Sequence, residues 1–451
     1  MILKSINPFD RKLLAEFEEH TSDEVCELMK QTAESFESWK STDFKIRASL
    51  MKNAAGILRK NREVYARTIT QEMGKLLRES LAEVEKCAWV CEYFAENAEK
   101  QLKDEVIRTD ASKSYVKYEP LGTILGIMPW NFPFWQVFRF LAPTLMAGNT
   151  ALLKHASNVQ GCASHIKDII MDAGFPDPVF SILIIGSDKI EYVIDNVHIK
   201  AVTLTGSEHA GSAVASLSGK RIKKSVLELG GSNAFIVFED ANIENAVKES
   251  ITARFMNCGQ SCIAAKRFLI HHSIAKRFTA RFKEEVQKLK VGNPMDPEVQ
   301  LGPLVNQKQA EEIEKQVRES IALGARALMP LKRDRAFFYP LILDRVKPGM
   351  PVFDEEVFGP VAPIISFNND QEAVDLANNT RYGLGVSLYT EDTRRAEKLA
   401  AQFSDGAVFI NSLVKSDPRL PFGGTKKSGY GRELSSHGIR EFVNIKTIYF
   451  A

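Results

Sequence analysis

The chain has 451 residues, of which 44% are hydrophobic and 26% are charged, and its formal net charge is +2. This composition is ordinary for a globular protein of roughly three domains or sub-domains, and it gives no electrostatic reason to expect nucleic acid or an anionic membrane as a partner. Six cysteines do not make a disulfide framework in so long a chain, and the N-terminus has no apolar core of signal-peptide length. We therefore expect a cytoplasmic protein with free thiols.

The first hundred residues predict helices. Within 22–104, the stretches "DEVCELMKQTAESFESW" and "AEVEKCAWVCEYFAENAEKQL" carry apolar residues at three- and four-residue spacing. Cys87 and Cys91 lie one helical turn apart on the second of these stretches. They have no His or further Cys nearby to complete a metal site, so core packing is the favoured interpretation.

The period changes after Tyr115. "YVKYEPLGTILGIM" predicts a strand, a turn and a strand, and alternating strand and helix patterns follow it. The most apolar region, 124–153, is interrupted by Pro129, Pro133 and Pro143, so it predicts a buried segment rather than a membrane span. Further strands are expected at 149–155, 179–185, 201–207 and 224–231. Strands separated by helices in this way indicate βαβ units and a parallel sheet with both faces covered.

A second alternating series predicts a second α/β unit. Its expected strands are 233–238, 264–272, 360–367, 385–390 and 406–412, with helices between them. The chain closes with "EFVNIKTIYF", a strand pattern with no helix after it. Such a terminal strand needs a sheet to join, and another subunit is one source of that sheet.

Three stretches of the first unit have the residues for catalysis or nucleotide binding. Glu228 in "VLELGGSNAFIV" lies among apolar residues that raise a carboxyl pKa, which suits a general base, although a strand-end Glu paired with a Lys is the plainer interpretation. The turn Thr205-Gly206-Ser207 between a strand and a helix is able to cradle a phosphate, or is an ordinary turn. Asn131, in a loop stiffened by two prolines, is either an oxyanion donor or a residue that bonds its own backbone.

The stretch "FMNCGQSCIAAKRF" contains Cys258 and Cys262. A zinc site would need two more ligands at suitable spacing, and none is apparent in the sequence. A disulfide between the two cysteines would form only as a redox event in a reducing compartment. A nucleophile fits better, because the thiolate is reactive, Gly259 allows close backbone approach, and apolar neighbours shield a covalent intermediate from water.

Taken together, these stretches resemble the aldehyde dehydrogenase superfamily. "PWNFP", "TGS", "ELGG", "GQSC", "EEVFGP" and "PFGGTKKSGYGRE" occur in that family's order and rough spacing, over essentially the whole chain. The resemblance implies an α/β fold with a Rossmann-like NAD(P) domain, an α/β catalytic domain and a small β oligomerisation element. The expected boundaries are 1–111 and 126–229 for the NAD(P)-binding domain, 230–428 for the catalytic domain, and 112–125 with 429–451 for the oligomerisation element, in a homodimer or homotetramer.

The resemblance also implies roles for particular residues. Cys262 would attack the aldehyde carbonyl, the Asn131 side chain and the Cys262 backbone N–H would hold the oxyanion, and Glu228 would activate the water that hydrolyses the thioester. A reversible disulfide between Cys258 and Cys262 is an open possibility. No metal is implied.

The implied cofactor is NADP or NAD, with NADP favoured. NAD-preferring members often carry a Glu three residues after the lysine at Lys154, and Ser157 stands there instead, which removes a charge that would repel a 2′-phosphate. The cofactor-binding residues implied by the resemblance are Trp130, Lys154, Ser157, Thr205, Gly206, Ser207, Leu229, Glu356 and Phe358.

The substrate implied is a small-molecule aldehyde, most similar to that of bacterial succinate-semialdehyde dehydrogenases. Arg139 matches a position where that group binds the substrate carboxylate, and Ser416 lies in a loop that supplements it. An Arg paired with a structural acid is the alternative for Arg139. A second arginine of that group is replaced by Met256, which leaves glutarate semialdehyde and simple aliphatic aldehydes open.

Two further alternatives follow from the same residues. A catalytically inactive scaffold or binding protein would not need Cys262, Glu228 and Asn131 together. Transfer of the acyl group to coenzyme A is disfavoured by Glu228, because a water activator directs the thioester to hydrolysis.

Overall fold

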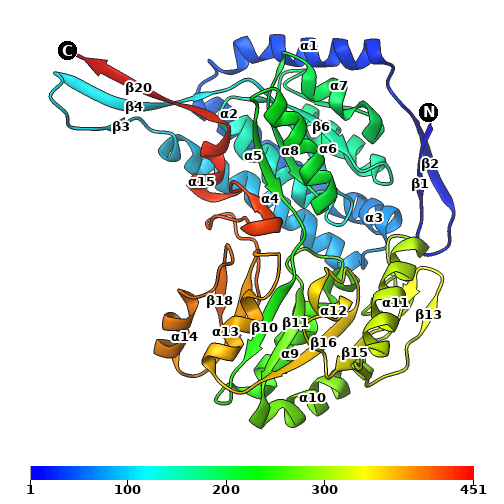
Figure 1. Ribbon diagram of the computed structural model, residues 1–451. Coiled ribbons are helices and arrows are strands. Elements are labelled where there is room, and N and C mark those ends of the chain that lie inside the picture. Colours follow the sequence, from blue (N-terminus) through cyan, green and yellow to red (C-terminus); the bar gives the residue numbers. More distant parts are fainter. Residues whose placement is uncertain (1) are drawn as a thin grey trace.

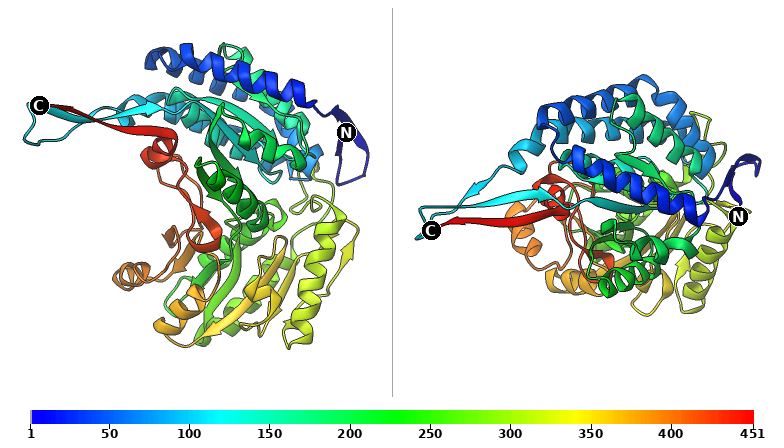
Figure 2. Two further views of the ribbon diagram at one scale, coloured as in Figure 1. Left: turned by 45° about the horizontal axis from the view of Figure 1, so that its top comes forward. Right: turned by 90° about the horizontal axis from the view of Figure 1, so that it is seen from above.

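Two parallel-stranded sheets, each flanked by helices, organise the computed structural model, which describes residues 2–451 (Figure 1). The expected α/β class with two units is confirmed by the order of these elements. A third, three-stranded sheet projects from the body as a long arm, and the C-terminus lies at its tip (Figure 2).

The helices expected before residue 104 are confirmed. They are α1 (Ser22–Trp39), α2 (Phe44–Lys60), α3 (Arg62–Met73) and α4 (Leu77–Gln101). Thr21 and Glu24 form a capping box at the start of α1, and α3 ends at Gly74, whose φ of 80° is the left-handed conformation that closes many helices. Cys87 and Cys91 are fully buried in the core of α4, as the spacing predicts.

The first sheet has the strand order β19-β9-β8-β5-β6-β7. Neighbouring strands are parallel except for the short β19 at the edge. The strands are β5 (Thr123–Met128), β6 (Thr150–His155), β7 (Phe180–Ile182), β8 (Ile199–Thr205), β9 (Lys224–Glu228) and β19 (Gly429–Tyr430). The connecting helices are α5 (Trp135–Met146), α6 (Gln160–Asp172), η1 (Ser187–Lys189), α7 (Ile190–Asp195) and α8 (Glu208–Lys220).

This strand order contains a reversal. From β5 the chain proceeds to β6 and β7 on one side, and then returns to place β8 and β9 on the other side. In open α/β sheets, ligands bind at such a reversal, outside the carboxyl ends of the strands. The ends of β5 and β8 therefore mark the expected cofactor site.

The second sheet has the order β12-β15-β16-β11-β10-β17-β18. Its strands are β10 (Asn233–Val237), β11 (Ala265–His271), β12 (Arg326–Ala327), β15 (Leu341–Asp344), β16 (Val361–Phe367), β17 (Val386–Tyr389) and β18 (Val408–Ile410). Around it lie α9 (Ile243–Phe255), η2 (Met256–Gly259), α10 (His272–Gln287), α11 (Gln307–Ala322), α12 (Pro351–Asp354), α13 (Asp370–Asn378) and α14 (Thr393–Ala400).

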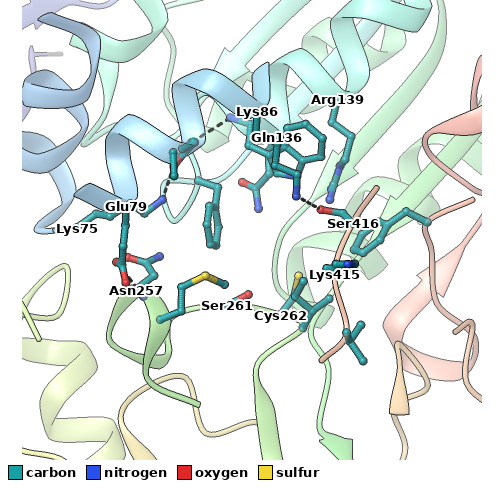
Figure 3. A pocket seen from close by; sticks show the side chains of 18 of the residues that line it. Lys75, Glu79, Lys86, Gln136, Arg139, Asn257, Ser261, Cys262, Lys415 and Ser416 are labelled. Atoms are coloured by element: carbon teal, nitrogen blue, oxygen red, sulfur yellow. Dashed lines mark hydrogen bonds and ion pairs between the residues drawn. The ribbon is translucent and has the colours of Figure 1, made fainter. Parts of the chain in front are cut away.

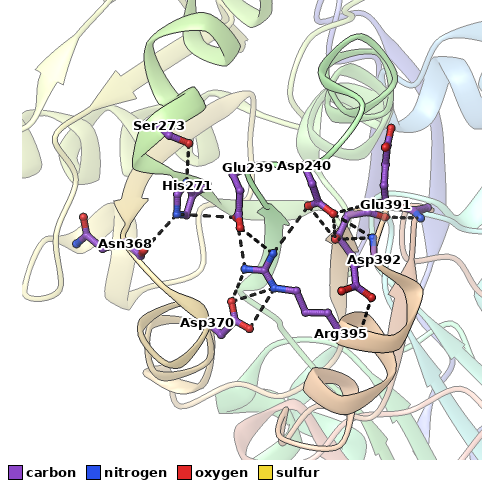
Figure 4. Close-up of polar contacts among 11 residues, drawn as sticks. Glu239, Asp240, His271, Ser273, Asn368, Asp370, Glu391, Asp392 and Arg395 are labelled. Carbon is purple, nitrogen blue, oxygen red and sulfur yellow. Dashed lines mark hydrogen bonds and ion pairs between the residues drawn. The ribbon is translucent and has the colours of Figure 1, made fainter.

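A charged cluster closes the carboxyl ends of the central strands of this sheet (Figure 4). Arg395 on α14 donates to Glu239, 2.9 Å away, and to Asp370, 3.0 Å away. Asp240, which follows β10, accepts hydrogen bonds from the Thr390 hydroxyl and from the backbone N–H of Asp392. Because these carboxylates are already paired with donors, this end of the second sheet is occupied by structural contacts.

The projecting sheet corrects one boundary drawn from the sequence. Its strands are β3 (Glu105–Val106), β4 (Lys113–Pro120) and β20 (Val443–Phe450), and β20 pairs antiparallel with β4 from Val443↔Pro120 to Phe450↔Lys113. The strand expected after the turn, β5, does not pair with β4 but is a central strand of the first sheet. The expected segment 112–125 therefore ends too late, because the chain changes direction at Gly122, whose φ is 136°. Likewise β19, within the expected 429–451, joins the first sheet.

Several small elements have no clear sequence pattern. They are the N-terminal hairpin β1 (Ile2–Ile6) and β2 (Leu13–Glu18), the hairpin β13 (Arg333–Asp334) and β14 (Phe337–Phe338), and the C-terminal turns η3 (Lys426–Ser428), α15 (Ser435–Ile439) and η4 (Arg440–Phe442). In β2 the residues from Leu14 onward alternate between exposed and half-buried, and none is fully buried, so this short strand gives only a weak pattern. In the described residues 2–451, no helix has the length and apolar character needed to span a membrane.

Candidate active site

The two sheets meet end to end where the chain crosses from one to the other (Figure 1). Glu228 is the last residue of β9, and β10 of the second sheet begins at Asn233. Asn233 pairs with Ala265 at the start of β11, three residues after Cys262. The topology thus brings the carboxyl end of the first sheet and the amino end of the second together at the two residues expected to be base and nucleophile.

The two glycines of the crossing leave no room for side chains. A Cβ atom added to Gly231 would lie 2.8 Å from the backbone oxygen of Cys262, and one added to Gly230 would lie 2.2 Å from Oε2 of Glu356. The Gly-Gly pair is therefore required by the close approach of the nucleophile loop and of Glu356.

The segment before Cys262 has an unusual backbone. Asn257 and Cys258 have φ values of 51° and 52°, and Gly259 follows with a φ of 74°. A left-handed conformation costs roughly 1–2 kcal/mol for each residue with a side chain. Three consecutive residues in this conformation turn the chain sharply before the nucleophile, and surrounding contacts must stabilise the turn.

Those contacts come from Asn257 and Arg254. The Asn257 amide donates to the backbone oxygens of Asn131, at 2.8 Å, and Gln260, at 3.1 Å. The buried Arg254 guanidinium donates to the backbone oxygens of Gly259, at 2.8 Å, and Ala265, at 2.9 Å. The loop that carries Cys262 is thus fixed on both sides, and it is joined directly to the Asn131 loop.

The Asn131 side chain faces the same loop. Its Nδ2 donates to the backbone oxygen of Gln260 at 3.1 Å, and its Oδ1 accepts from Gln136 at 3.1 Å. These bonds orient the amide and occupy only part of its capacity, since an amide NH₂ has two donors. The alternative, that Asn131 bonds only its own loop, does not agree with these contacts.

His155 at the end of β6 holds the Asn131 loop in place. Its Nε2 lies 2.9 Å from the Pro133 oxygen, and its Nδ1 lies 3.1 Å from the Met128 oxygen and 2.9 Å from the backbone nitrogen of Ala156, so the ring links the Asn131 loop to the ends of β5 and β6. Complete burial lowers the pKa of His155 to about 4, so the ring is neutral at physiological pH.

Cys262 lies half-buried in the turn between η2 and β11. Burial raises the pKa of its thiol to about 11, and the nearby cations of Arg139 and Lys266 oppose this rise. The Cys258 thiol is more deeply buried, and its pKa is raised to about 12. In the protein without ligands Cys262 is therefore a thiol at neutral pH, and a base or a bound cation has to promote the reactive thiolate.

Glu228 is completely buried and has no hydrogen-bond partner on either carboxyl oxygen among the described residues. Burial raises its pKa well above the usual value, and the neighbouring Glu433 raises it further. The plainer interpretation, a strand-end Glu paired with a Lys, is not what residues 2–451 show. Because an unpartnered buried carboxyl group is costly, its presence here favours a functional role.

Arg139 on α5 takes up a different contact from the one expected. Its Nε forms a buried ion pair with Glu433, and its Nη2 donates to the Thr205 hydroxyl at 3.2 Å. This contact agrees with the alternative interpretation of the sequence, in which Arg139 pairs with a structural acid. Arg139 nonetheless lines the pocket beside Cys262, as does the other expected substrate-binding residue, Ser416.

The pocket beside Cys262 has a volume of about 250 Å³ (Figure 3). Its apolar walls include Phe132, Trp135 and Phe422, and its polar groups come mainly from α4, α5 and the 413–416 loop. Neither Glu228 nor Asn131 belongs to its wall. The charged and polar residues that line it are Lys75, Glu79, Glu83, Lys86, Gln136, Arg139, Asn257, Ser261, Lys415 and Ser416.

The expected cofactor residues lie at the carboxyl ends of the first sheet's strands. Trp130 follows β5, Lys154 lies near the end of β6, and Thr205 ends β8. Gly206 and Ser207 lead into α8, where the Ser207 hydroxyl accepts from the Ala210 N–H and caps the helix. The free backbone N–H groups of this helix start, at the strand-order reversal, fit the pyrophosphate of a dinucleotide.

Glu356 and Phe358 approach this region from the second unit. Trp130 and Phe358 make an edge-on contact with ring centroids 5.9 Å apart. Glu356 accepts from the Gly231 N–H at 3.1 Å and pairs with Lys266 at 2.8 Å. Leu229 lies at the crossing between the sheets, where it packs against Gly211 of α8.

Ser157 is set apart from the other cofactor residues. It is exposed and lines a second pocket together with Trp130 and the N-terminal hairpin. Lys154, three residues earlier, is buried, and burial lowers its pKa while Glu19 and Asp188 oppose that shift.

Sequence reasoning did not identify several residues of the site. Lys266 donates to the backbone oxygen of Cys262 at 2.8 Å while it pairs with Glu356, and so it joins the nucleophile loop to the expected cofactor residue. The sequence places Lys266 in the stretch "AAKRF", but it does not indicate which groups the side chain contacts. Glu79, Lys86 and Glu433 were also missed, because the fold brings each from a segment distant in the sequence. Gln136 and Asn257 lie only five residues from Asn131 and Cys262, and their hydrogen bonds to the site identify them.

The chain is similar to known proteins over its whole length. The model of the aldehyde dehydrogenase family matches residues 2–448. A probable succinate-semialdehyde dehydrogenase (NADP(+)) of Synechocystis sp. is 46% identical over 454 residues, with 100% of both chains covered. A succinate semialdehyde dehydrogenase (NAD(P)+) of Escherichia coli is 42% identical and covers 99% of this chain and 97% of its own. Among solved structures, succinic semialdehyde dehydrogenase of Streptococcus pyogenes in complex with NADP+ has a TM-score of 0.97 and 34% identity, with 99% of each chain covered.

Proposed function

Because the chain belongs to the aldehyde dehydrogenase family, we propose that it oxidises succinate semialdehyde to succinate with NADP⁺, through a thioester on Cys262. The observation that carries this proposal is the arrangement where the two sheets join. The Asn131 amide donates to the backbone oxygen of Gln260, two residues before Cys262, and the unpartnered Glu228 is near enough to raise the pKa of the Cys262 thiol. A nucleophile, a base and an oxyanion donor at one point are the parts that acyl chemistry requires.

The first step is the attack of the Cys262 sulfur on the aldehyde carbon. The thiol gives its proton to water as the S–C bond forms, and the π electrons of the carbonyl move to its oxygen. The product is a thiohemiacetal oxyanion, which the Asn131 amide and the Cys262 backbone N–H would stabilise. When held by the residues at the carboxyl ends of β5, β6 and β8, the cofactor would supply the acceptor for a hydride from the former aldehyde carbon, and this separate oxidation would turn the adduct into the thioester. The buried walls of the pocket keep water away from the resulting thioester until hydrolysis.

Glu228 serves the second step. Its raised pKa makes its carboxylate a strong base, which takes a proton from water as the water oxygen attacks the thioester carbon. The C–S bond then breaks, the carboxylic acid leaves, and the sulfur regains a proton. Hydrolysis assisted in this way disfavours transfer to coenzyme A.

We assign the cofactor to the carboxyl ends of β5, β6 and β8. Gly206 and Ser207 would hold the pyrophosphate, Thr205 and Leu229 would lie beside it, and Lys154 would bind the adenosine ribose. On the nicotinamide side, the contacts would come from Trp130, Glu356 and Phe358. The exposed Ser157 hydroxyl offers a donor to a 2′-phosphate, which supports NADP⁺ over NAD⁺.

The substrate assignment is supported by the relatives' names and by the cations around the pocket. Ser416 would contact the substrate's carboxylate tail, while Arg139, expected from the sequence to do so, lines the same pocket but is paired with Glu433. An uncharged aliphatic aldehyde is the second candidate, which the aromatic walls of the pocket favour, and glutarate semialdehyde is a longer acid of the same kind.

The test is a steady-state panel of succinate semialdehyde, glutarate semialdehyde and butanal with each cofactor, on the parent protein and on Cys262→Ser. We expect the highest kcat/KM with succinate semialdehyde and NADP⁺, and no measurable oxidation by the variant. Equal kcat/KM for butanal would refute the substrate assignment, and parent-like activity of Cys262→Ser would refute the reaction path.

The projecting sheet supports a homodimer or homotetramer. Val106, Ile445 and Phe450 on its strands are exposed large apolar side chains, and such a surface is stabilised by a second copy of the chain. Sedimentation equilibrium tests this assembly, and a monomer at micromolar concentration would contradict it. We also retain the cytoplasm as the proposed location, supported by six unpaired cysteines.

A further inference from the structure

We propose that Lys86 is the cation that binds the carboxylate tail of the substrate, together with the Ser416 hydroxyl. This inference rests on the proposed function and deepens it, because it assigns the charge that would distinguish a semialdehyde acid from an uncharged aldehyde. Lys86 stands in the middle of α4, within a pattern that the sequence alone presents as an ordinary amphipathic helix.

Lys86 and the nucleophile belong to one pocket. The Lys86 Nζ donates to Ser416 Oγ at 2.8 Å and lies 4.1 Å from the centre of the Trp135 ring. Both residues line the pocket that also contains Cys262, and Figure 3 shows the Lys86–Ser416 bond across the cavity from the Cys262 loop. An aldehyde with its carbonyl at Cys262 would extend its tail toward this bond.

Of the cations around this pocket, Lys86 has its charge least compensated. Lys75 forms a buried ion pair with Glu83, and Arg139 forms one with Glu433. Lys415 is exposed, so water solvates it. Among the described residues Lys86 has no ion-pair partner, and a neutral hydroxyl and an aromatic ring are its contacts. Lys86 is half-buried, and a partly desolvated ammonium without a counter-ion is costly, so a substrate carboxylate would supply the missing charge.

The groups around Lys86 explain why it needs an anion. Burial, together with the nearby Arg139 cation on α5, lowers its pKa to about 8. Glu83 and Cys87 on the same helix and Asp417 in the 413–417 loop act in the opposite direction, but Asp417 is held by Arg419 at 2.7 Å. A carboxylate bound beside Lys86 would raise its pKa again, so substrate binding and protonation reinforce each other.

This coupling has a definite sign. Below pH 8 Lys86 is charged in the free enzyme, and binding of the acid tail is at full strength. Above pH 8 the free enzyme must first take up a proton, so the KM for succinate semialdehyde rises with pH. The KM for butanal, which has no charged tail, stays constant over the same range.

The experiment compares Lys86→Gln, Lys86→Arg and the parent protein on succinate semialdehyde and butanal with NADP⁺. We expect Lys86→Gln to raise the KM for the semialdehyde by roughly 10- to 100-fold with little effect on butanal, since a hydrogen bond to a charged group is lost. Lys86→Arg keeps most of the preference and removes the pH dependence above pH 8, because arginine stays protonated. Lys100→Met, which removes an exposed lysine of the same helix, is the matched control and is expected to behave like the parent.

The outcomes separate this inference from the proposed function. If the parent protein itself does not prefer succinate semialdehyde over butanal, the proposed function fails. If the parent has the preference and Lys86→Gln retains it, Lys86 is not the anchor. Should Lys86→Gln prove inactive or misfolded, the pH profile of the parent decides, and a KM for the semialdehyde that is flat from pH 7 to 9 would overturn the inference.

Discussion

Adding a single methyl group at Gly231 tests whether the crossing between the sheets sets the position of the nucleophile. The Cβ of Gly231→Ala would lie 2.8 Å from the Cys262 backbone oxygen and 3.2 Å from the Asn233 side chain. Carbon and oxygen atoms normally come no closer than about 3.3 Å, so the Cys262 carbonyl has to move by roughly 0.5 Å. The Lys266 Nζ, which binds the same oxygen at 2.8 Å, resists that movement.

A displacement of about 1 Å at a reacting group costs roughly 100-fold in rate, so half of that predicts a loss in kcat on the order of tenfold. Steady-state kcat with succinate semialdehyde and the thermal unfolding midpoint are measured on the same preparations. Gly56→Ala is the matched control, because Gly56 lies inside α2 with no atom within 4 Å of an added Cβ. The control is expected to be stabilised by about 1 kcal/mol with kcat unchanged. If Gly231→Ala retained the parent kcat within twofold, the packing of the crossing against the nucleophile loop would not control catalysis.

Three further outcomes follow from the structure. In the cofactor-free protein, alkylation of Cys262 by iodoacetamide, followed by mass spectrometry of its own peptide, is expected to rise about tenfold per pH unit from pH 7 to 9, because the thiol pKa is raised to about 11; a plateau below pH 8 would contradict this. Ser157→Glu is expected to raise the KM for NADP⁺ roughly tenfold or more and to leave that for NAD⁺ nearly unchanged, through repulsion of the 2′-phosphate; equal effects on both cofactors would remove Ser157 from the 2′-phosphate site. Arg395→Met, which removes the contacts to Glu239 and Asp370, is expected to lower the free energy of unfolding by about 2 kcal/mol with kcat retained; a loss of kcat in the folded protein would show that this cluster supports the site.

The alternation of strands and helices predicted the two α/β units, because buried parallel strands are short apolar runs with helices between them. The pairing of the strands was not available from the same pattern. The stretch 115–128 reads as one hairpin, yet β4 pairs with β20 and β5 pairs with β6 and β8. A local sequence pattern predicts that a segment is a strand, but it does not predict which other strands pair with it.

The expected catalytic residues come from the junction of the two sheets. Asn131 and Glu228 stand at carboxyl ends of the first sheet, and Cys262 precedes a strand of the second sheet at its amino end. The contacts that determine the charge of the residues around the site could not be predicted from the sequence. Lys86 and Ser416 are 330 positions apart, and only the fold brings them within hydrogen-bond distance. The ion pair between Arg139 and Glu433 likewise joins α5 to the C-terminal segment, so an arginine expected to face substrate already has an acid partner.

The most direct test of the account is a single-turnover experiment on Glu228→Gln with succinate semialdehyde and NADP⁺. Removal of the base should leave the first step intact and slow hydrolysis. We predict a burst of NADPH close to one equivalent per subunit and, after acid quenching, an acyl group on the peptide that contains Cys262. A variant that gives no burst, or an acyl group found on any other residue, would contradict the thioester path.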